Sequence, residues 1–432
     1  MLTTARSWDP LYGRLEMTPF ESDLIALPEV QRLRYVRMCN INSLLVSGAS
    51  EISRFEHTLG VMHLTKCWVA AHGIPESEGR DLIAAAALHD MQTGPFGHSM
   101  QYVLEDNTTP DDFVHEDIAH GRRSDYHQNT LASSSFSGKP FSAHSLLGKR
   151  MESVAAIIRG EGQYGPLISG TMDLDNIDNV VRLAFHVGVA TDADRTIPLR
   201  LAQVLNASGG ELVLPVSATD SVIRWQAIRT RLYSLLLNDW AEFSAKGMLT
   251  KAIEIAIKHD LIGADCWLMT DGAFLDFLDA KGLGEAQETR ELVRRLRRGD
   301  LYDPIAIMES PDIDAYAAVS GAEAKKSIEL ELTRKSKGRG VRPLVHFILD
   351  KGKTERAIKV RLAESSESIV IGHSSSRLLC GLFVSHSRLN ELDRERLLQL
   401  FSDVLREHGI GNAIPIPDPM GESPTDSQLS LL

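Results

Sequence analysis

Cysteine is scarce in this chain, and the few cysteines present are not spaced for a shared task. The 432 residues contain four of them, which stand singly at Cys39, Cys67, Cys266 and Cys380. A zinc knuckle or a redox dithiol needs close pairs of cysteines, so neither kind of site is expected. We expect no disulfides, and therefore a reducing compartment.

Long apolar runs and a targeting signal are also missing. No stretch approaches the roughly 20 apolar residues that a helix needs to cross a bilayer. The first 20 residues contain no basic segment that leads into an apolar run, as a secretory signal would. We therefore expect a cytoplasmic protein that makes no contact with a membrane.

The chain has no excess of positive charge. Its 46 Lys and Arg are outnumbered by 58 Asp and Glu, which gives a net charge of −12. Nucleic acid is therefore not the favoured partner, because proteins that bind it are typically basic. One basic cluster, residues 334–361, has ten Lys and Arg. A solvated face is its default interpretation, and the alternative is a site for a regulatory nucleotide or a single strand.

What the sequence does contain is helical periodicity over its first two thirds. Apolar residues recur with helical spacing at 20–38, 55–72 and 80–90, and again in later segments. After about residue 331 the pattern changes to short runs rich in Val, Ile and Leu, which predict strands. The segment 390–409 predicts a closing helix that ends at Gly409.

These patterns predict a mainly α fold: a helical core, a further helical region and a small C-terminal α/β subdomain. We assign the core to residues 1–200, with a polar insertion at about 107–145 that is a lid or a functional loop. The helical extension covers 201–330 and the α/β subdomain 331–412. Residues 413–432 are rich in Pro and Ser, and we expect them to be disordered.

Histidine and aspartate gather at three places in the helical part. His57 lies beside an apolar stripe in "RFEHTLGVMHL", where a histidine more often simply packs in a core. His89 and Asp90 end an alanine-rich helix, where a buried core tolerates neither group without a partner. Asp175 lies in the apolar helical context of "MDLDNIDN". Two imidazoles and two carboxylates from three helices can hold one divalent metal ion with positions left for water and phosphate.

The three motifs together resemble those of the HD-domain metal-dependent phosphohydrolases, which have a histidine, a His-Asp pair and a distal aspartate. The resemblance is closest to the deoxynucleoside triphosphate triphosphohydrolases, begins at "DPLYGRLEMTPF" and covers about residues 8–410. It implies a helical HD-domain core and assigns one divalent ion, Mn, Fe, Co, Zn or Mg with Mn favoured, to four ligands. These ligands are His57, His89, Asp90 and Asp175.

The resemblance also implies roles around the metal. Arg54 and Arg229 match arginines that contact the phosphates of the substrate, and His98 and His115 match histidines of the catalytic pocket. Family members assemble into oligomers through nucleotide contacts, so a homo-oligomer and a regulatory nucleotide are expected as well.

The departures from the family pattern concern the scissile group and the sugar. Thr93 replaces an inner histidine that acts on the scissile group in family mechanisms. Asn176, Asn179 and Leu183 replace a lysine, a tyrosine and an aspartate that hold the phosphates and the sugar 3′-hydroxyl. Leu237 stands where a further tyrosine contacts the sugar. The two asparagines are therefore the candidate substrate contacts at these positions, and sugar recognition is altered.

Three functions follow from these observations. The favoured one is hydrolysis of a nucleotide, with a dNTP cleaved to deoxynucleoside and triphosphate. The second is a nucleotide-sensing regulatory protein, which the loss of histidine at Thr93 supports. The third is an HD-type nuclease or a dinuclear metal enzyme, whose extra ligands would come from the insertion. The candidates for that role are His115, His120, His127 and His144.

Overall fold

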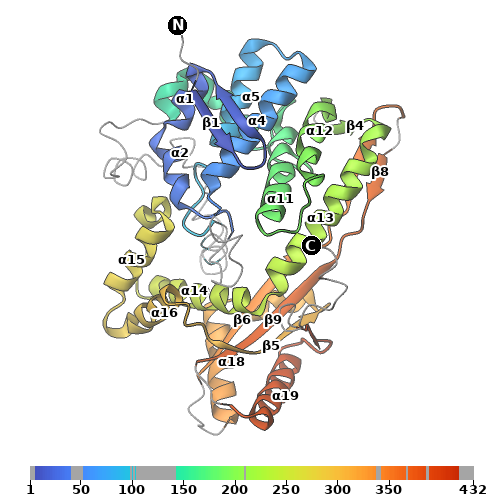
Figure 1. Ribbon diagram of the computed structural model, residues 1–432. Coiled ribbons are helices and arrows are strands. Elements are labelled where there is room, and N and C mark those ends of the chain that lie inside the picture. Colours follow the sequence, from blue (N-terminus) through green and yellow to red (C-terminus); the bar gives the residue numbers. More distant parts are fainter. Residues whose placement is uncertain are drawn as a thin grey trace.

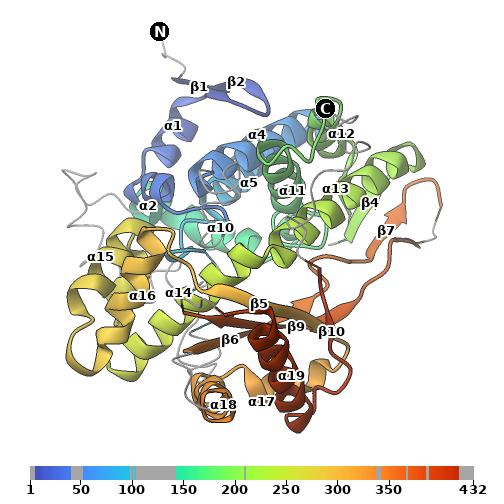
Figure 2. The ribbon, with the colours of Figure 1, turned by 60° about the horizontal axis from the view of Figure 1, so that its bottom comes forward.

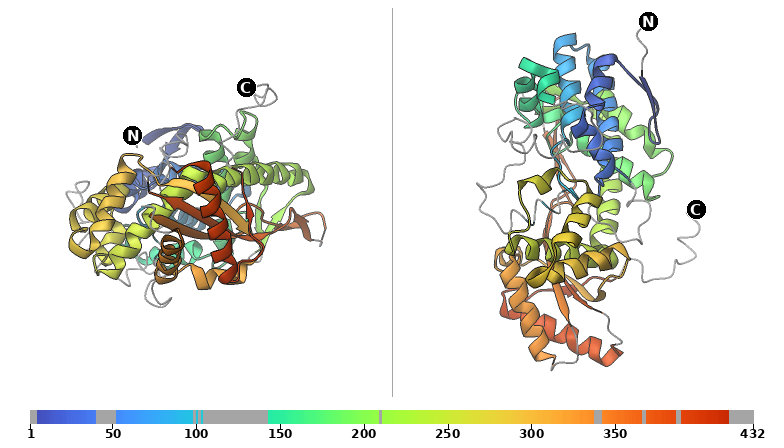
Figure 3. Two further views of the ribbon diagram at one scale, coloured as in Figure 1. Left: turned by 90° about the horizontal axis from the view of Figure 1, so that it is seen from below. Right: turned by 90° about the vertical axis from the view of Figure 1, so that its left-hand side faces the viewer.

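The computed structural model has a helical region at one end and a sheet flanked by helices at the other (Figure 1; Figure 3, right). It describes residues 5–39, 52–97, 100, 103, 143–208, 211–336, 342–365, 368–385 and 389–417. The expected fold class, mainly α with a small C-terminal α/β region, is confirmed. Within the described residues, no helix has the length and apolar character needed to cross a membrane.

The chain starts with a short antiparallel hairpin that leads into the first helices. Strand β1 (Ala5–Asp9) pairs with β2 (Gly13–Met17). The next segment was expected to be one helix, but it divides into α1 (Pro19–Ile25) and α2 (Pro28–Arg32). Proline has no N–H to donate and disfavours helical geometry in the residue before it, so the helix restarts at Pro28.

The helical core is built around α4 (Arg54–His72), which carries the first candidate ligand. Ser53 caps its first turn, and Gly73 ends it in the left-handed conformation. Helices α5 (Glu76–Leu88) and α11 (Leu174–His186) both pack against α4, so the candidate metal ligands come from these adjacent helices or, for His89 and Asp90, from the turn directly after α5. The other helices of this region are α9 (Ala143–Leu147), α10 (Met151–Ile158), α12 (Ile197–Val204) and α13 (Thr219–Asn238).

A four-stranded sheet forms the opposite end of the molecule, with strand order β10-β5-β9-β6. Its faces are covered by different helices because side chains alternate along each strand. One face packs against α14 (Trp240–Lys258) and the other against α18 (Ala322–Lys335) and α19 (Glu391–Glu407) (Figure 2). The strands are β5 (Asp303–Ser310), β6 (Pro343–Lys351), β9 (Ser376–Val384) and β10 (Ile414–Pro415). The remaining helices here are α15 (Asp271–Lys281), α16 (Gln287–Arg297) and α17 (Tyr316–Val319).

A second sheet ties the C-terminal part of the chain to the helical core. Its order is β3-β4-β7-β8, and β4 pairs with β7 in parallel. Its strands are β3 (Asn206–Ser208), β4 (Glu211–Leu214), β7 (Ile358–Leu362) and β8 (Ser368–Ile371). The connection between β6 and β7, residues 352–357, therefore runs from one sheet to the other along α13. This route brings a C-terminal segment to the helical core.

The Val-, Ile- and Leu-rich runs after residue 331 form strands β6, β7, β8 and β9, as expected. Two boundaries differ from the expectation. Strand β5 lies within the expected helical extension, yet it belongs to the sheet of the α/β region. Residues 414–415, in the expected disordered tail, form β10 because the edge of β5 offers unpaired backbone groups. Ile416 is buried against the same sheet. Residues 418–432, and residues 107–142 of the expected insertion, lie outside the described residues.

Candidate metal centre

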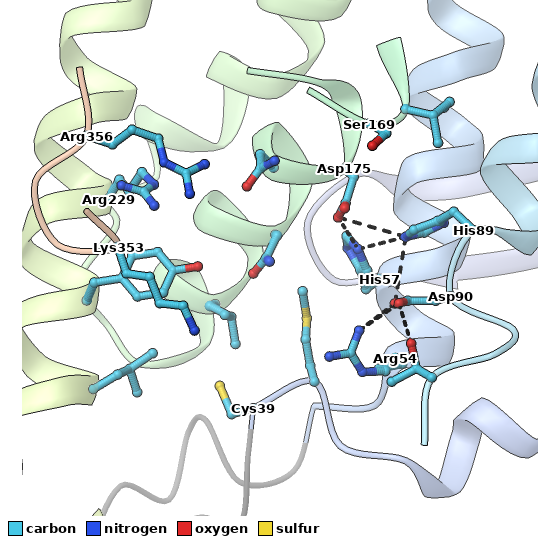
Figure 4. A pocket seen from close by; sticks show the side chains of 18 of the residues that line it. Cys39, Arg54, His57, His89, Asp90, Ser169, Asp175, Arg229, Lys353 and Arg356 are labelled. Atoms are coloured by element: carbon cyan, nitrogen blue, oxygen red, sulfur yellow. Dashed lines mark hydrogen bonds and ion pairs between the residues drawn. The ribbon is translucent and has the colours of Figure 1, made fainter. Parts of the chain in front are cut away.

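A pocket of about 450 Å³ lies between the core helices and the β6–β7 connection (Figure 4). It is lined by every expected site residue that the structure describes. These residues are His57, His89, Asp90, Asp175, Arg54, Arg229, Asn176 and Asn179. The two expected catalytic histidines, His98 and His115, lie outside the described residues.

The two histidines of the pocket present the same ring nitrogen to each other. His57 has its Nδ1 atom 2.7 Å from Asp178 Oδ2, and His89 has its Nδ1 atom 2.8 Å from the backbone oxygen of Ala86. These acceptors hold the proton on Nδ1 and leave both Nε2 atoms turned into the pocket, 3.3 Å apart. Asp175 Oδ1 lies 2.8 Å from His57 Nε2 and 3.8 Å from His89 Nε2.

Asp90 completes the cluster and is held in place from two sides. Arg54 Nη1 lies 2.7 Å and 2.8 Å from the two carboxylate oxygens of Asp90. The Thr93 hydroxyl donates to Oδ1 of the same carboxylate at 2.8 Å. His89 Nε2 lies 3.7 Å from the other oxygen. Thr93, which departs from the family pattern, therefore orients a candidate ligand.

The donor set fits a divalent metal ion. His57, His89 and Asp90 each offer one ligand atom, and these atoms lie within 4.8 Å of one another. Burial disfavours a charged His57, but hydrogen bonds with Asp175 and Asp178 outweigh burial and raise the pKa of His57 to about 10. Without a metal, a proton thus sits between His57 and the carboxylates, and a bound cation would displace it. Mixed imidazole and carboxylate ligands suit transition metals such as Mn, Fe, Co and Zn.

Asp178 belongs to this centre, although the sequence reading did not single it out. It is fully buried, accepts from Tyr12 Oη at 2.6 Å and pairs with Arg182 Nε at 2.8 Å. Burial alone would raise the pKa of Asp178, but Arg182 and His57 outweigh it and hold the pKa well below its usual value. An ionised Asp178 fixes the ring of His57, as carboxylates behind ligand histidines commonly do.

The sequence spacing of Asp178 could have indicated that it supports the metal centre. Asp178 lies three residues after Asp175 and four before Arg182, so the three share one face of α11. The arginine also contacts Asp9 Oδ2 at 2.9 Å and Glu56 Oε1 at 2.6 Å. A buried network therefore links the metal centre to the N-terminal hairpin.

Gly60 of α4 leaves the space that this network occupies. A Cβ atom at this position would overlap Arg182 and Asp178. We expect Gly60→Ala to lower the free energy of unfolding by about 2 kcal/mol or more, because the displaced groups are buried and charged. Urea unfolding measures this loss. The control is Gly272→Ala in helix α15, where a Cβ atom meets nothing within 4 Å, so this variant should be at least as stable as wild type. If Gly60→Ala were as stable as Gly272→Ala, the prediction would be wrong.

The wall opposite the ligand cluster is cationic. Figure 4 shows Arg229, Lys353 and Arg356 on the side of the pocket away from His57 and His89. Arg229 is only 2% exposed, and its Nε atom has no hydrogen-bond partner. The ring of Tyr233, which also lines the pocket, lies 4.8 Å from the guanidinium carbon of Arg229. Leu237, which stands in place of an expected tyrosine, lines the pocket one turn further along α13.

The two substituted asparagines differ in their contacts. Asn176 Nδ2 donates to Asp173 Oδ1 at 2.9 Å, so its amide is already engaged near the start of α11. Asn179 Oδ1 is buried and has no hydrogen-bond partner. Asn179 is therefore the better placed of the two to contact a ligand in the pocket.

Cys39 also lines the pocket, but it is not suited to act as a nucleophile. Burial raises the pKa of its thiol to about 12. Because the thiolate is the reactive form, the thiol at this position is inert at neutral pH. The chemistry of the pocket therefore depends on its histidines, carboxylates and cations.

Comparison with known proteins points to the same family as the geometry. The HD domain family model matches residues 54–159, which include three of the candidate ligands. The human deoxynucleoside triphosphate triphosphohydrolase SAMHD1 is 38% identical over 97 residues, which are 21% of this chain and 15% of the human protein. A Dictyostelium discoideum homologue of SAMHD1 is 22% identical over 337 residues, which are 73% of this chain and 63% of that protein.

Two further similarities extend over most of the chain. The uncharacterized Bacillus subtilis protein YwfO is 25% identical over 402 residues, which are 86% of this chain and 83% of that one. The crystal structure of a phosphohydrolase from Bacteroides thetaiotaomicron shares the fold, with a TM-score of 0.63 at 15% sequence identity. The match covers 88% of this chain and 99% of the Bacteroides chain. Residues 54–159 therefore carry an HD domain, and the chain is similar to deoxynucleoside triphosphate triphosphohydrolases.

Proposed function

We propose that the protein is a metal-dependent phosphohydrolase that acts on a nucleotide, with cleavage of a dNTP to deoxynucleoside and triphosphate as the favoured reaction. The observation that carries this proposal is the pair of imidazole Nε2 atoms, 3.3 Å apart, that face two carboxylates across from a cationic wall. Such a pocket combines metal ligands with groups that bind phosphate, which is the requirement for hydrolysing a phosphoester.

The metal would be held by His57, His89, Asp90 and Asp175, and we favour Mn²⁺ among Mn, Fe, Co, Zn and Mg. When bound, it supplies Lewis acidity toward a phosphate oxygen and lowers the pKa of water. Because the ligands are two nitrogens and two carboxylates, a transition metal fits better than Mg²⁺.

The residues of the chain supply the remaining functions. Arg54 fixes Asp90, and its buried Nε has no partner, which leaves a donor for the phosphate next to the sugar. Arg229 would neutralise charge that develops on the phosphates. Water attacks the phosphorus next to the sugar, the bond from that phosphorus to the sugar oxygen breaks, and the oxygen takes up a proton. We assign the proton transfers to His98 or His115 and the altered sugar contacts to Asn176 and Asn179.

The proposal also includes the location of the protein, its oligomeric state and a regulatory ligand. A cytoplasmic location suits four cysteines that form no disulfide in the described part of the chain. We expect a homo-oligomer and a regulatory nucleotide, as the resemblance implies.

A nucleotide-sensing role is the second candidate function, and one observation favours it. Thr93 occupies the position of an expected catalytic histidine, and its hydroxyl is engaged by Asp90. The pocket therefore lacks one proton-transfer group that the family pattern includes. For a nuclease or dinuclear enzyme, His115, His120 and His127 lie outside the described residues. His144, at the start of α9, is not among the residues that line the pocket.

The test is a survey of substrates with defined products. Purified protein with Mn²⁺ is incubated with the four dNTPs and the four NTPs, singly and mixed, and the products are resolved by chromatography. We expect deoxynucleoside and triphosphate from at least one dNTP, and no product after treatment with EDTA. Release of only orthophosphate or pyrophosphate would mean a different point of cleavage. Binding without turnover of any nucleotide would favour the sensing role.

A further inference from the structure

The structure divides the basic cluster of residues 334–361 into two groups. Lys353 and Arg356, both half-buried, line the pocket of the metal centre. Lys351 and Lys359, their neighbours in the sequence, are exposed and do not line it. The default interpretation of the cluster as a solvated face therefore holds for the second pair but not for the first.

The backbone that carries the first pair is fixed to α13. Gln226 Nε2 donates to the backbone oxygen of Arg356, and Thr230 Oγ1 donates to that of Thr354 at 3.2 Å. Arg229, on the same face of the helix, has its Nη1 3.5 Å from the backbone oxygen of Gly352. Contacts from three side chains at i, i+3 and i+4 thus hold the β6–β7 connection against the helix.

A carboxylate at the end of β6 shapes the turn from inside. Asp350 is 1% exposed and accepts from the backbone N–H of Lys353 at 2.7 Å and from Thr354 Oγ1 at 2.8 Å. Gly352 has a φ of +74°, which a residue with a side chain rarely adopts. The conformation of this connection is therefore specified by its own sequence.

The side chains of the β6–β7 connection line two different pockets. Lys353 and Arg356 line the pocket of the metal centre, while Thr354 and Glu355 line a neighbouring pocket. Glu355 is engaged there by Ser375 Oγ at 2.6 Å and His373 Nε2 at 2.9 Å. The single carboxylate of the connection thus faces away from the metal centre, which leaves the net charge on the pocket side positive.

The cationic wall brings several positive charges close together. Burial lowers the pKa of Arg229; the nearby Arg356 lowers it further, and Tyr233 and Asp350 offset part of the shift. Three carboxylates line the pocket. Asp90 is paired with Arg54, Asp175 lies at the histidines, and the charge of Glu242 acts on Lys246. Converging cations cost free energy, and a bound polyanion offsets this cost.

This inference rests on the proposed function and names further substrate-binding residues for it. We propose that Lys353 and Arg356 form, with Arg229, a clamp for the phosphate chain of the substrate. The wall faces the metal centre across the pocket, so a ligand that reaches both must extend negative charge beyond the phosphate at the metal (Figure 4). The clamp would supply from the C-terminal region the positive charge that Asn176 does not provide next to Asp175.

The test measures binding of inorganic triphosphate and of orthophosphate by calorimetry, with EDTA present so that only the protein's own cations act. We compare wild type with Lys353→Ala, Arg356→Ala and the double variant. Each single change should weaken triphosphate binding about tenfold, because a hydrogen bond to a charged group is lost. Orthophosphate binding should change about twofold at most. The matched controls Lys351→Ala and Lys359→Ala remove the same charge nearby and should bind triphosphate like wild type.

Several results would overturn the clamp. These are a wild type that does not bind triphosphate, a double variant that binds it as tightly as wild type, and controls that lose as much affinity as the pocket variants. Thermal unfolding checks that the variants stay folded, which we expect because both side chains are only half-buried.

The same variants keep the clamp and the proposed function distinguishable. If wild type hydrolyses a dNTP, the double variant should raise KM at least tenfold with little change in kcat. Hydrolysis with an unchanged KM would reject the clamp and keep the function. Triphosphate binding that depends on Lys353 and Arg356, without hydrolysis of any nucleotide, would keep the clamp and reject the function.

Discussion

Asp175→Ala is expected to abolish hydrolysis without unfolding the protein. The carboxylate lies 2.8 Å from His57 Nε2, and its side chain is 32% exposed, so it contributes more to the metal centre than to the core. Loss of a metal that acts as a Lewis acid removes several kcal/mol of transition-state stabilisation, which corresponds to a rate lower by about 10³-fold or more.

The measurement combines three readouts on one preparation. Metal content by elemental analysis should fall well below one ion per chain. The hydrolysis rate with the nucleotide that wild type cleaves fastest should fall by about 10³-fold or more, and the melting temperature should change little. Asp192→Ala serves as the matched control, because that carboxylate is 95% exposed and lies outside the pocket. It should keep metal and activity.

The same variant separates enzyme from sensor. A protein that acts by turnover loses its biological effect together with its activity when Asp175 is replaced. A protein that acts by binding nucleotide keeps the effect. Full hydrolysis by Asp175→Ala would remove this residue from the catalytic centre and leave the proposed ligand set wrong.

The candidate metal ligands could be singled out from the sequence because their signals are local. His57, His89, Asp90 and Asp175 each stand in a short motif on a helix or directly after one. Helical periodicity places these helices on faces that pack together. The residue types then limit the chemistry, since a buried His-Asp pair needs a partner. The strands after residue 331 were equally readable, because their Val-, Ile- and Leu-rich runs are bounded by polar turns.

The cationic wall could not be predicted in this way. Lys353 and Arg356 lie more than 100 residues from α13 in the sequence, and no local pattern distinguishes them from Lys351 and Lys359. Their position follows from the parallel pairing of β4 with β7, which is a long-range contact. Likewise, the assignment of β5 to the C-terminal sheet depends on pairing with β9, some 70 residues later. Tertiary contacts of this kind leave no trace in a short window of sequence.

Arg182→Leu is expected to lower the free energy of unfolding by about 3–5 kcal/mol. The side chains of Arg182, Asp9 and Asp178 are all completely buried, and the guanidinium pairs with both carboxylates at 2.9 Å and 2.8 Å. Removal of the only cation that these two carboxylates share in the described network leaves buried negative charge uncompensated. Urea unfolding measures the loss. Arg14→Leu is the control, since Arg14 and Glu16 are both more than half exposed and such pairs contribute about 0–1 kcal/mol.

The network also predicts a link between stability and metal binding. Without Arg182, Asp178 is no longer held against His57 Nδ1, and loss of such support typically weakens metal affinity about 10–100-fold. Adding Asp178→Asn to Arg182→Leu removes one of the uncompensated charges, so the double variant should be more stable than the sum of the single effects predicts. Its metal affinity should nevertheless stay low, because the asparagine cannot hold His57 as an ionised carboxylate does. Strict additivity of the two stability changes would mean that Arg182 and Asp178 act independently, and the buried network would then not be the support of the metal centre.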